Sequence, residues 1–193
     1  GLQSSQGSSV ATNHSVDSLS MPSWRKQVAY LPQSPHIIST TLRNNLTFYQ
    51  PDATEEEIAH ALELVGLTSL VTELPKGLDT VVGEGGRSLS GGQSQRVALA
   101  RAVLHRTCRV LVFDEPTAHL DIETEWELKQ RMLPLMEGKL VFFATHRLHW
   151  LSEMDEILLL EDGQVRDFGS YEALSKASSF AYLSSHEKEG GNV

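Results

Sequence analysis

The 193-residue sequence has one cysteine, few aromatic residues and no excess of basic charge. A single cysteine, Cys108, excludes a disulfide framework and a thiolate metal cluster, and it is typical of a reducing compartment. Lys and Arg number 16 against 25 Asp and Glu, so the net charge of −9 argues against a nucleic-acid partner, which needs a basic face. The longest apolar run, residues 140–144, is far shorter than the ~18 residues of a membrane span. We therefore expect a soluble, cytoplasmic segment.

Short apolar runs alternate with helical patterns along the chain. Runs of four or five apolar residues are typical of strands buried on both faces in a parallel sheet, and we expect 110–113, 140–144 and 157–160 to be such strands. Apolar positions spaced by three or four residues indicate helices. The predicted strands are 27–31, 110–113, 140–144, 157–160 and 165–168, the last two as an antiparallel hairpin. The predicted helices are 40–46, 54–65 (with Thr54 and Glu57 as a capping box), 93–105, 122–136 and a short one capped by Ser170. This alternation predicts an α/β fold with a mainly parallel sheet flanked by helices.

Composition suggests where the folded part begins and ends. Residues 1–23 are rich in serine and poor in apolar side chains, so we expect a lead-in that buries little surface. Residues 24–183 carry the predicted elements, and residues 184–193 form a polar tail.

The sequence Leu89-Ser90-Gly91-Gly92-Gln93 stands at the start of a predicted helix. A serine and two glycines leave backbone N–H groups accessible, and the helix dipole adds partial positive charge there. Such a segment can bind a phosphate, although a Gly-Gly pair before a helix is more often a plain turn.

Polar side chains follow three of the predicted strands. Asp114 and Glu115 come directly after the strand 110–113, His146 follows the strand 140–144, and Gln33 follows the first strand. Ligands in parallel sheets bind at the carboxyl ends of strands. There an aspartate can hold Mg²⁺, and a second carboxylate can activate a water molecule. For an isolated Asp-Glu pair or a lone histidine, an ordinary surface position is the simpler explanation.

Five of these segments together resemble the motifs of ATP-binding cassette (ABC) ATPases, in the family order. The matching segments are Gln33 (Q-loop), Leu89 to Gln93 (signature motif), Val110 to Glu115 (Walker B strand with the catalytic glutamate), Ala118 to Asp121 (D-loop) and His146 (switch histidine). The resemblance implies a P-loop NTPase-like fold with an inserted helical subdomain at about 34–106.

The resemblance also implies the substrate, the cofactor and the roles of the residues. ATP would be hydrolysed with Mg²⁺ as cofactor, in a head-to-tail pair with a second ABC ATPase domain, the same or different, attached to transmembrane domains. The implied catalytic residues are Glu115, His146 and Gln33, and the implied Mg²⁺ residues are Asp114 and Gln33. The implied nucleotide-binding residues are Ser90, Gly91, Gly92, Gln93 and Asp121.

Two further features narrow the resemblance. Thr80 to Gly86 resembles the T-x-V-G-E-x-G segment that contacts the membrane domains in ABC exporters. The amino-acid sequences of residues 117–125 and 144–150 are most similar to the CydD-type subunit of the cysteine or glutathione exporter needed for cytochrome bd assembly.

The phosphate-binding loop of the family, G-x-x-x-x-G-K-[ST], does not occur in the 193 residues. Of the six lysines only Lys139 follows a glycine, and Leu140 comes next. We therefore expect a truncated domain whose first part lies before Gly1. Loss of the P-loop strand is expected to expose apolar edges beside residues 110–113, and the chain alone is expected to be unstable and inactive.

Two other functions remain open. The chain could be a non-catalytic partner that supplies only a signature motif to another ATPase, and the missing P-loop favours this. Alternatively it could be a soluble ABC ATPase acting on DNA or ribosomes, which the exporter-like segment and the acidic charge disfavour.

Overall fold

The computed structural model describes residues 10–11, 14–15, 22–118 and 120–176. By its internal contacts the chain divides into two compact units, residues 1–143 and 144–193. Most of the predicted lead-in, the whole of the predicted tail, and His119 lie outside the described residues. No helix in the described part is long and apolar enough to cross a membrane.

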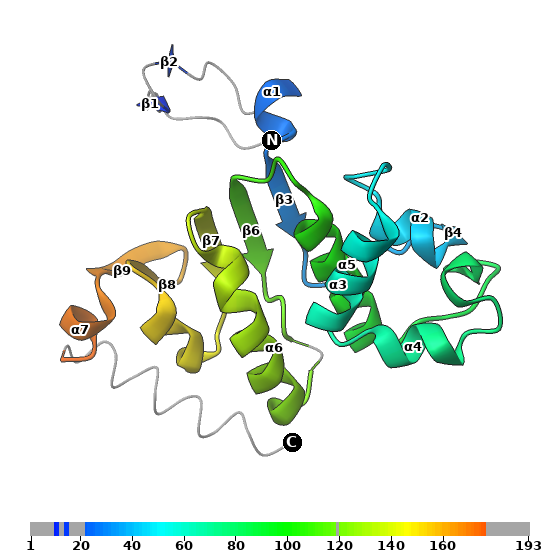
Figure 1. The fold of residues 1–193 in the computed structure, drawn as a ribbon. Coiled ribbons are helices and arrows are strands. Elements are labelled where there is room, and N and C mark those ends of the chain that lie inside the picture. The colour runs from blue at the N-terminus through cyan, green and yellow to red at the C-terminus, as the bar shows by residue number, and fades with distance from the viewer. Residues whose placement is uncertain (1–9, 12–13, 16–21, 119, 177–193) are drawn as a thin grey trace. The chain divides into compact units, whose positions relative to one another are not determined.

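A three-stranded sheet forms the centre of the first unit (Figure 1). Its order is β3 (Val28–Leu31), β6 (Val110–Asp114) and β7 (Leu140–Ala144). Strands β3 and β6 are parallel, with Leu31 opposite Phe113. The predicted α/β fold with a parallel sheet is confirmed.

Helices account for most of the remaining first unit. They are α2 (Leu42–Leu46), α3 (Glu55–Leu64), α4 (Thr68–Glu73), α5 (Gly91–Leu104) and α6 (Ile122–Met136, with Pro134 in its last turn). Four of them match predicted helices to within two residues, but α4 was not predicted, because it is one short helix without a capping side chain. Shorter elements are β1 (Val10–Ala11), β2 (His14–Ser15), α1 (Pro22–Arg25), β4 (Thr40–Thr41), the 3₁₀ turn Gly77–Asp79 and β5 (Val81–Val82).

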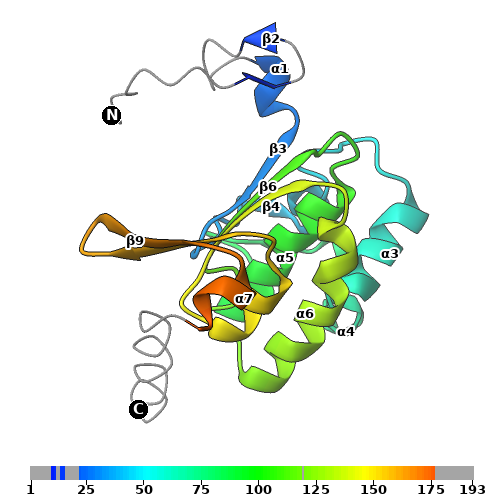
Figure 2. The same cartoon turned by 90° about the vertical axis from the view of Figure 1, so that its left-hand side faces the viewer.

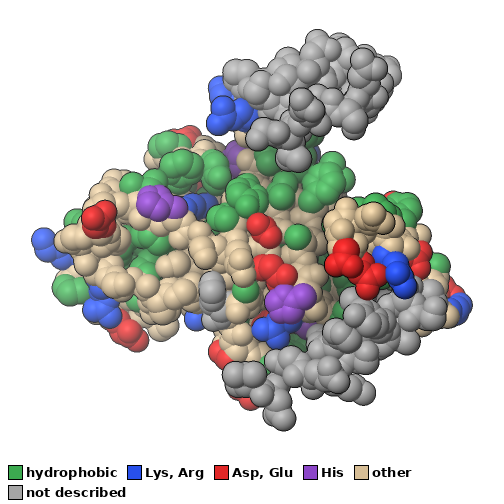
Figure 3. Space-filling model, turned by 180° about the vertical axis from the view of Figure 1, so that it is seen from behind, with side chains coloured by type: hydrophobic (Ala, Val, Ile, Leu, Met, Phe, Trp, Pro, Cys, Tyr) green, Lys and Arg blue, Asp and Glu red, His purple; other side chains and the backbone are tan. Residues whose placement is uncertain are grey.

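The two faces of the sheet differ in burial. Helices α5 and α6 lie along the sheet in Figure 2. Ala29, Leu31 and Phe113 are almost fully buried, and the ring centroids of Phe113 and Phe143 are 5.3 Å apart. Side chains that alternate with these, such as Tyr30 and Phe142, are half-exposed. Figure 3 shows hydrophobic side chains gathered in the upper central part of that view.

Two predictions about burial were therefore wrong. The strand 140–144 is not buried on both sides, because Leu140 and Phe142 remain 54% and 56% exposed. The expected exposed sheet edge is also not at residues 110–113, because β6 is the central strand, with β3 on one side and β7 on the other.

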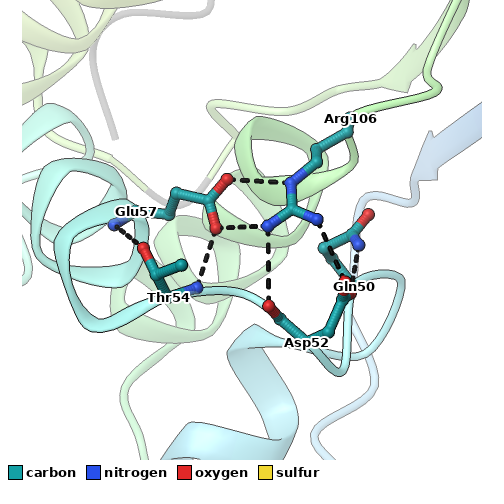
Figure 4. A network of polar contacts seen from close by, with 5 residues as sticks. All are labelled: Gln50, Asp52, Thr54, Glu57 and Arg106. Carbon is teal, nitrogen blue, oxygen red and sulfur yellow. Dashed lines mark hydrogen bonds and ion pairs between the residues drawn. The ribbon is translucent and has the colours of Figure 1, made fainter.

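A network of polar side chains connects the loop after α5 to the start of α3 (Figure 4). Thr54 caps α3 by accepting a hydrogen bond from the N–H of Glu57, and the Glu57 carboxylate accepts one from the N–H of Thr54. The same carboxylate pairs with Arg106, 2.6 Å away, and Arg106 also contacts Asp52 at 3.1 Å. The predicted capping box is thus confirmed.

The second unit contains the antiparallel hairpin of β8 (Ile157–Glu161) and β9 (Gln164–Gly169). Asp162 and Gly163, both at positive φ, form its turn. The hairpin was predicted, but β8 is not the buried strand that its apolar run suggested, since Leu158 and Leu160 are exposed. A two-stranded hairpin leaves one side of each strand without a neighbour. The unit also holds the 3₁₀ segment Leu148–Glu153 and α7 (Tyr171–Leu174), which Ser170 caps as predicted.

Candidate functional site

The parallel register of β3 and β6 places three of the predicted site residues at one edge of the sheet. Asp114 ends β6, Glu115 follows it, and Gln33 lies two residues beyond the end of β3. Because Leu31 and Phe113 are opposite each other, these residues leave the sheet side by side. The carboxyl edge of a parallel sheet is where such folds bind ligands.

Asp114 has a neighbour that the sequence reasoning missed. The hydroxyl of Tyr30, on β3, donates a hydrogen bond of 3.2 Å to Oδ2 of Asp114. Loss of solvation, and then this hydrogen bond and the aspartate charge, raise the pKa of Tyr30. The parallel pairing of β3 with β6 brings the two side chains together. The contact could be predicted only from the register of the two strands, which sequence motifs do not reveal.

The donor set at this edge fits Mg²⁺. Mg²⁺ is usually held by one or two carboxylates together with waters and substrate phosphates, not by a full protein cage. Asp114 supplies one carboxylate, of which Tyr30 engages Oδ2, and Gln33 supplies a neutral amide oxygen on an exposed loop.

The backbone of Glu115 has an unusual conformation. Its φ is +49°, in the left-handed region, which costs a non-glycine residue about 1–2 kcal/mol. Its carbonyl accepts hydrogen bonds from the N–H of Ala118 at 3.1 Å and from Nε2 of Gln95 at 3.4 Å. Strain of this kind persists only where the surroundings hold it, and it is found most often at functional sites.

Helix α5 begins with a second capping box. Oγ of Ser90 accepts from the N–H of Gln93, and Oε1 of Gln93 accepts from the N–H of Ser90. The first two helical residues, Gly91 and Gly92, carry N–H groups that have no partner within the helix. The first turn contains no acidic residue. The start of α5 therefore keeps the positive end of its dipole available to an anion.

Asp121 is the cap of α6. Its Oδ1 accepts from the N–H of Thr124 at 2.9 Å and its Oδ2 from the Thr124 hydroxyl at 2.7 Å. These hydrogen bonds, the backbone one first, lower the pKa of Asp121. In the preceding segment, the buried hydroxyl of Thr117 donates to the buried carboxylate of Glu125 on α6. The side chain of Asp121 thus caps the N-terminus of α6. The contact of Asp121 with nucleotide stays a prediction.

The segment after Gln33 is attached to α5 through a half-buried arginine. Arg101 donates from Nη1 to the carbonyl of His36 at 3.0 Å and from Nε to the carbonyl of Asn45 at 2.7 Å. Fully buried Asn45 in turn exchanges two hydrogen bonds with the backbone of Ile38. Desolvation lowers the pKa of Arg101. Helix α5 and the segment after Gln33 are thus joined by side-chain contacts.

The segment that resembles the exporter motif, Thr80 to Gly86, packs against the same stretch. Strand β5 pairs with β4, and the Ser39 hydroxyl donates to the carbonyl of Glu84. Gly83, at φ +88°, lies so close to Ile37 and Ile38 that a Cβ there would come within 3.1 Å of the Ile38 carbonyl oxygen. An open pocket of about 430 Å³ lies between residues 34–37 and 83–89.

His146 lies in the second unit, two residues after β7, and is exposed. The expectation that it shares an edge with Asp114 and Glu115 stays a prediction.

Comparison with known proteins gives the family. The model of the ABC transporter family matches residues 1–118. Over 152 residues the chain is 56% identical to the glutathione/L-cysteine transport system ATP-binding/permease protein CydC of Bacillus subtilis. The aligned residues make up 79% of the chain and 27% of the relative. Over 190 residues it is 37% identical to the CydD protein of the same description from Escherichia coli, covering 98% of the chain and 32% of the relative.

A solved structure supports the same assignment. A bacterial Atm1-family ABC exporter with ATP bound aligns with 86% of the chain at a TM-score of 0.76 and 30% identity, and the chain covers 29% of it. The chain thus spans about a third or less of these relatives. It belongs to the ABC transporter family and corresponds to the ATPase domain of the exporter-type members.

Proposed function

We propose that the chain is part of the ATP-hydrolysing motor of an exporter subunit of the CydC/CydD kind. The observation that carries the proposal is the shared edge of β3 and β6, where Gln33, Asp114 and the strained Glu115 come together. The relatives named above, both described as glutathione/L-cysteine transport proteins, suggest a thiol-containing small molecule as cargo. Identity does not separate the two types, because the CydC and CydD proteins of Escherichia coli are each 37% identical to the chain, so the proposal includes both.

Each residue at the edge has a chemical task in this proposal. The Glu115 carboxylate would accept the proton of the water that attacks the terminal phosphate, and Gln33 would orient that water. Asp114, steadied by Tyr30, would hold Mg²⁺, and bound Mg²⁺ would neutralise phosphate charge. His146 would donate a hydrogen bond to the terminal phosphate.

The start of α5 would act on a different ATP. An accessible helix N-terminus without acids favours a phosphate. In a head-to-tail pair of ATPase domains, residues 90–93 would contact the nucleotide held by the partner, with Asp121 nearby. ATP would then favour the closed pair, and hydrolysis would release it.

The membrane domains would contact the surface formed by residues 34–37 and 83–89. This proposal is supported by the pocket there and by the close packing of Gly83, which connects that surface to the Q-loop segment. The chain would therefore work at the cytoplasmic face of a membrane as part of a longer subunit, which would also supply the phosphate-binding loop.

The test uses the full-length subunit together with its partner ATPase in lipid nanodiscs. Glu115→Gln should lower the ATPase rate by about 100-fold or more, since the base is lost, while ATP still drives closure because the charge contacts remain. Normal turnover by this variant would rule out Glu115 as the base. If wild-type protein closes with ATP but its own site never turns over, the chain is instead a non-catalytic partner that lends a signature motif.

A further inference from the structure

The interior side of α5 carries a polar side chain that the proposed mechanism has not used. Gln95 is 1% exposed and lies two residues after Gln93, one turn beyond the first helical residue Gly91. Its neighbours on the same helix, Val97 to Ala100, are buried and apolar. Burying an amide among apolar side chains is unfavourable unless its hydrogen bonds are made, so its contacts identify its purpose.

The amide of Gln95 bridges two segments of the catalytic edge. Its Nε2 lies 3.4 Å from the carbonyl oxygen of Gln33 and 3.4 Å from the carbonyl oxygen of Glu115. An amide nitrogen has two hydrogens, one for each carbonyl. The opposite orientation of the amide would place its oxygen against two carbonyl oxygens, so the contacts fix which atom faces them.

The contact with Glu115 coincides with the strained backbone. At φ +49° the peptide needs support from its surroundings, and its carbonyl has two donors, Gln95 and Ala118. Ala118 belongs to the same local turn, whereas Gln95 comes from the signature helix. Gln95 is therefore the contact through which α5 can influence the direction of the Glu115 side chain.

We propose that Gln95 is a positioning residue that couples the signature helix to the catalytic edge by holding the backbones of Gln33 and Glu115 in register. The proposal rests on the proposed function, in which Glu115 is the base. When the start of α5 meets a nucleotide, a shift of the helix is transmitted through one amide to both the Q-loop glutamine and the base. Arg101, two turns further on, holds the continuing Q-loop segment to the same helix.

The variant Gln95→Leu removes both N–H donors of the amide and replaces the side chain with one of similar volume. In the full-length subunit with its partner, we expect kcat for ATP hydrolysis to fall between about 10- and 100-fold, as for a misplaced catalytic group, with KM for ATP changed little. Gln95→Asn keeps the donor on a shorter side chain and should recover part of the rate. Val97→Ala, equally buried on the same helix, is the matched control and should lower thermal stability without that loss of kcat.

A double-mutant cycle separates positioning from mere stability. In a Glu115→Gln background, Gln95→Leu should cause a clearly smaller fold-loss of turnover than in wild type, because the part of its effect that passes through Glu115 is already gone and only the part through Gln33 remains. Additive losses, or a Gln95→Leu variant with normal kcat, would overturn the proposal. If Glu115→Gln alone turned over normally, the proposed function would fail instead, so the two failures are distinguishable.

Discussion

Helices α3 and α5 begin with the same motif and differ in charge. In each, a hydroxyl residue and a side chain three positions later exchange hydrogen bonds with each other's backbone, Thr54 with Glu57 and Ser90 with Gln93. The first turn of α3 contains three glutamates, and Arg106 pairs with Glu57. The first turn of α5 contains two glycines and no acid.

This difference separates a structural helix start from one suited to binding. The acids of α3 compensate the helix dipole within the chain, so nothing external is needed. At α5 the cap is complete, yet the dipole and the N–H groups of Gly91 and Gly92 remain for an outside anion. Under the proposed function, the same local geometry would serve stability at one helix and phosphate binding at the other.

The largest expected effect comes from giving α5 the charge of α3. In the full-length subunit with its partner, Gly92→Asp should lower ATP hydrolysis by about 100-fold, since a carboxylate replaces an accessible anion site with a repulsive one. Steady-state ATPase assays measure this. Glu56→Gln, a neutralisation in the first turn of α3, is the control and should leave the rate unchanged.

Removing either cap should have a smaller and more instructive effect. Ser90→Ala and Thr54→Ala should each lower the free energy of unfolding by about 1 kcal/mol, the usual value of an N-cap. Denaturant unfolding of the full-length subunit measures the loss. Only Ser90→Ala should also weaken ATP-driven closure; an equal loss of closure in both variants would show that the two helix starts do not differ in function.

The smallest expected effect concerns the ion pairs of α3. Hydrogen bonding to Arg106, foremost, lowers the pKa of Glu57 from 4.5 to about 2. Because the folded pKa is the lower one, the stabilisation is present above pH 4.5 and is lost as the pH falls toward 2. Arg106→Met should therefore be less stable than wild type at pH 7, and the two melting curves should converge between pH 4.5 and 2. Both groups are exposed, so 1 M salt should also reduce the difference. A difference in melting temperature between the two proteins that does not change with pH would contradict the assigned ion pair.

Sequence reasoning predicted the capping box of α3 but not that of α5. Acidic residues and regular apolar spacing marked the first, whereas Gly91 and Gly92 suggested a loop, so the helix was predicted to begin at Gln93 and not at Gly91. Glycine lowers helix propensity, and the hydrogen bonds of Ser90 and Gln93 outweigh that preference.

The candidate site was predictable as motifs but not as contacts. Asp114, Glu115 and Gln33 could be placed at one edge because the apolar run before the acids predicts a parallel strand. Tyr30, Gln95 and the left-handed backbone of Glu115 depend on strand register and on packing between distant segments, which local pattern does not encode. A glutamine among the apolar positions of α5 was the one available signal. The exposure of Leu140 and Phe142 on β7 was not predicted, because a run of apolar residues does not reveal whether one or both faces of a strand are covered.

The most direct test of the account is ATP-dependent association measured in a Glu115→Gln background, where hydrolysis cannot reopen the pair. Distances between spin labels on the two ATPase domains should shorten with Mg-ATP in that background, and should stay long when Gly92→Asp is added. The unfolding free energy of the Gly92→Asp protein should be equal to or higher than that of its parent, because an acid near a helix N-terminus stabilises the helix. Closure of the Gly92→Asp protein with Mg-ATP would contradict the claim that the uncharged start of α5 binds the nucleotide of the partner.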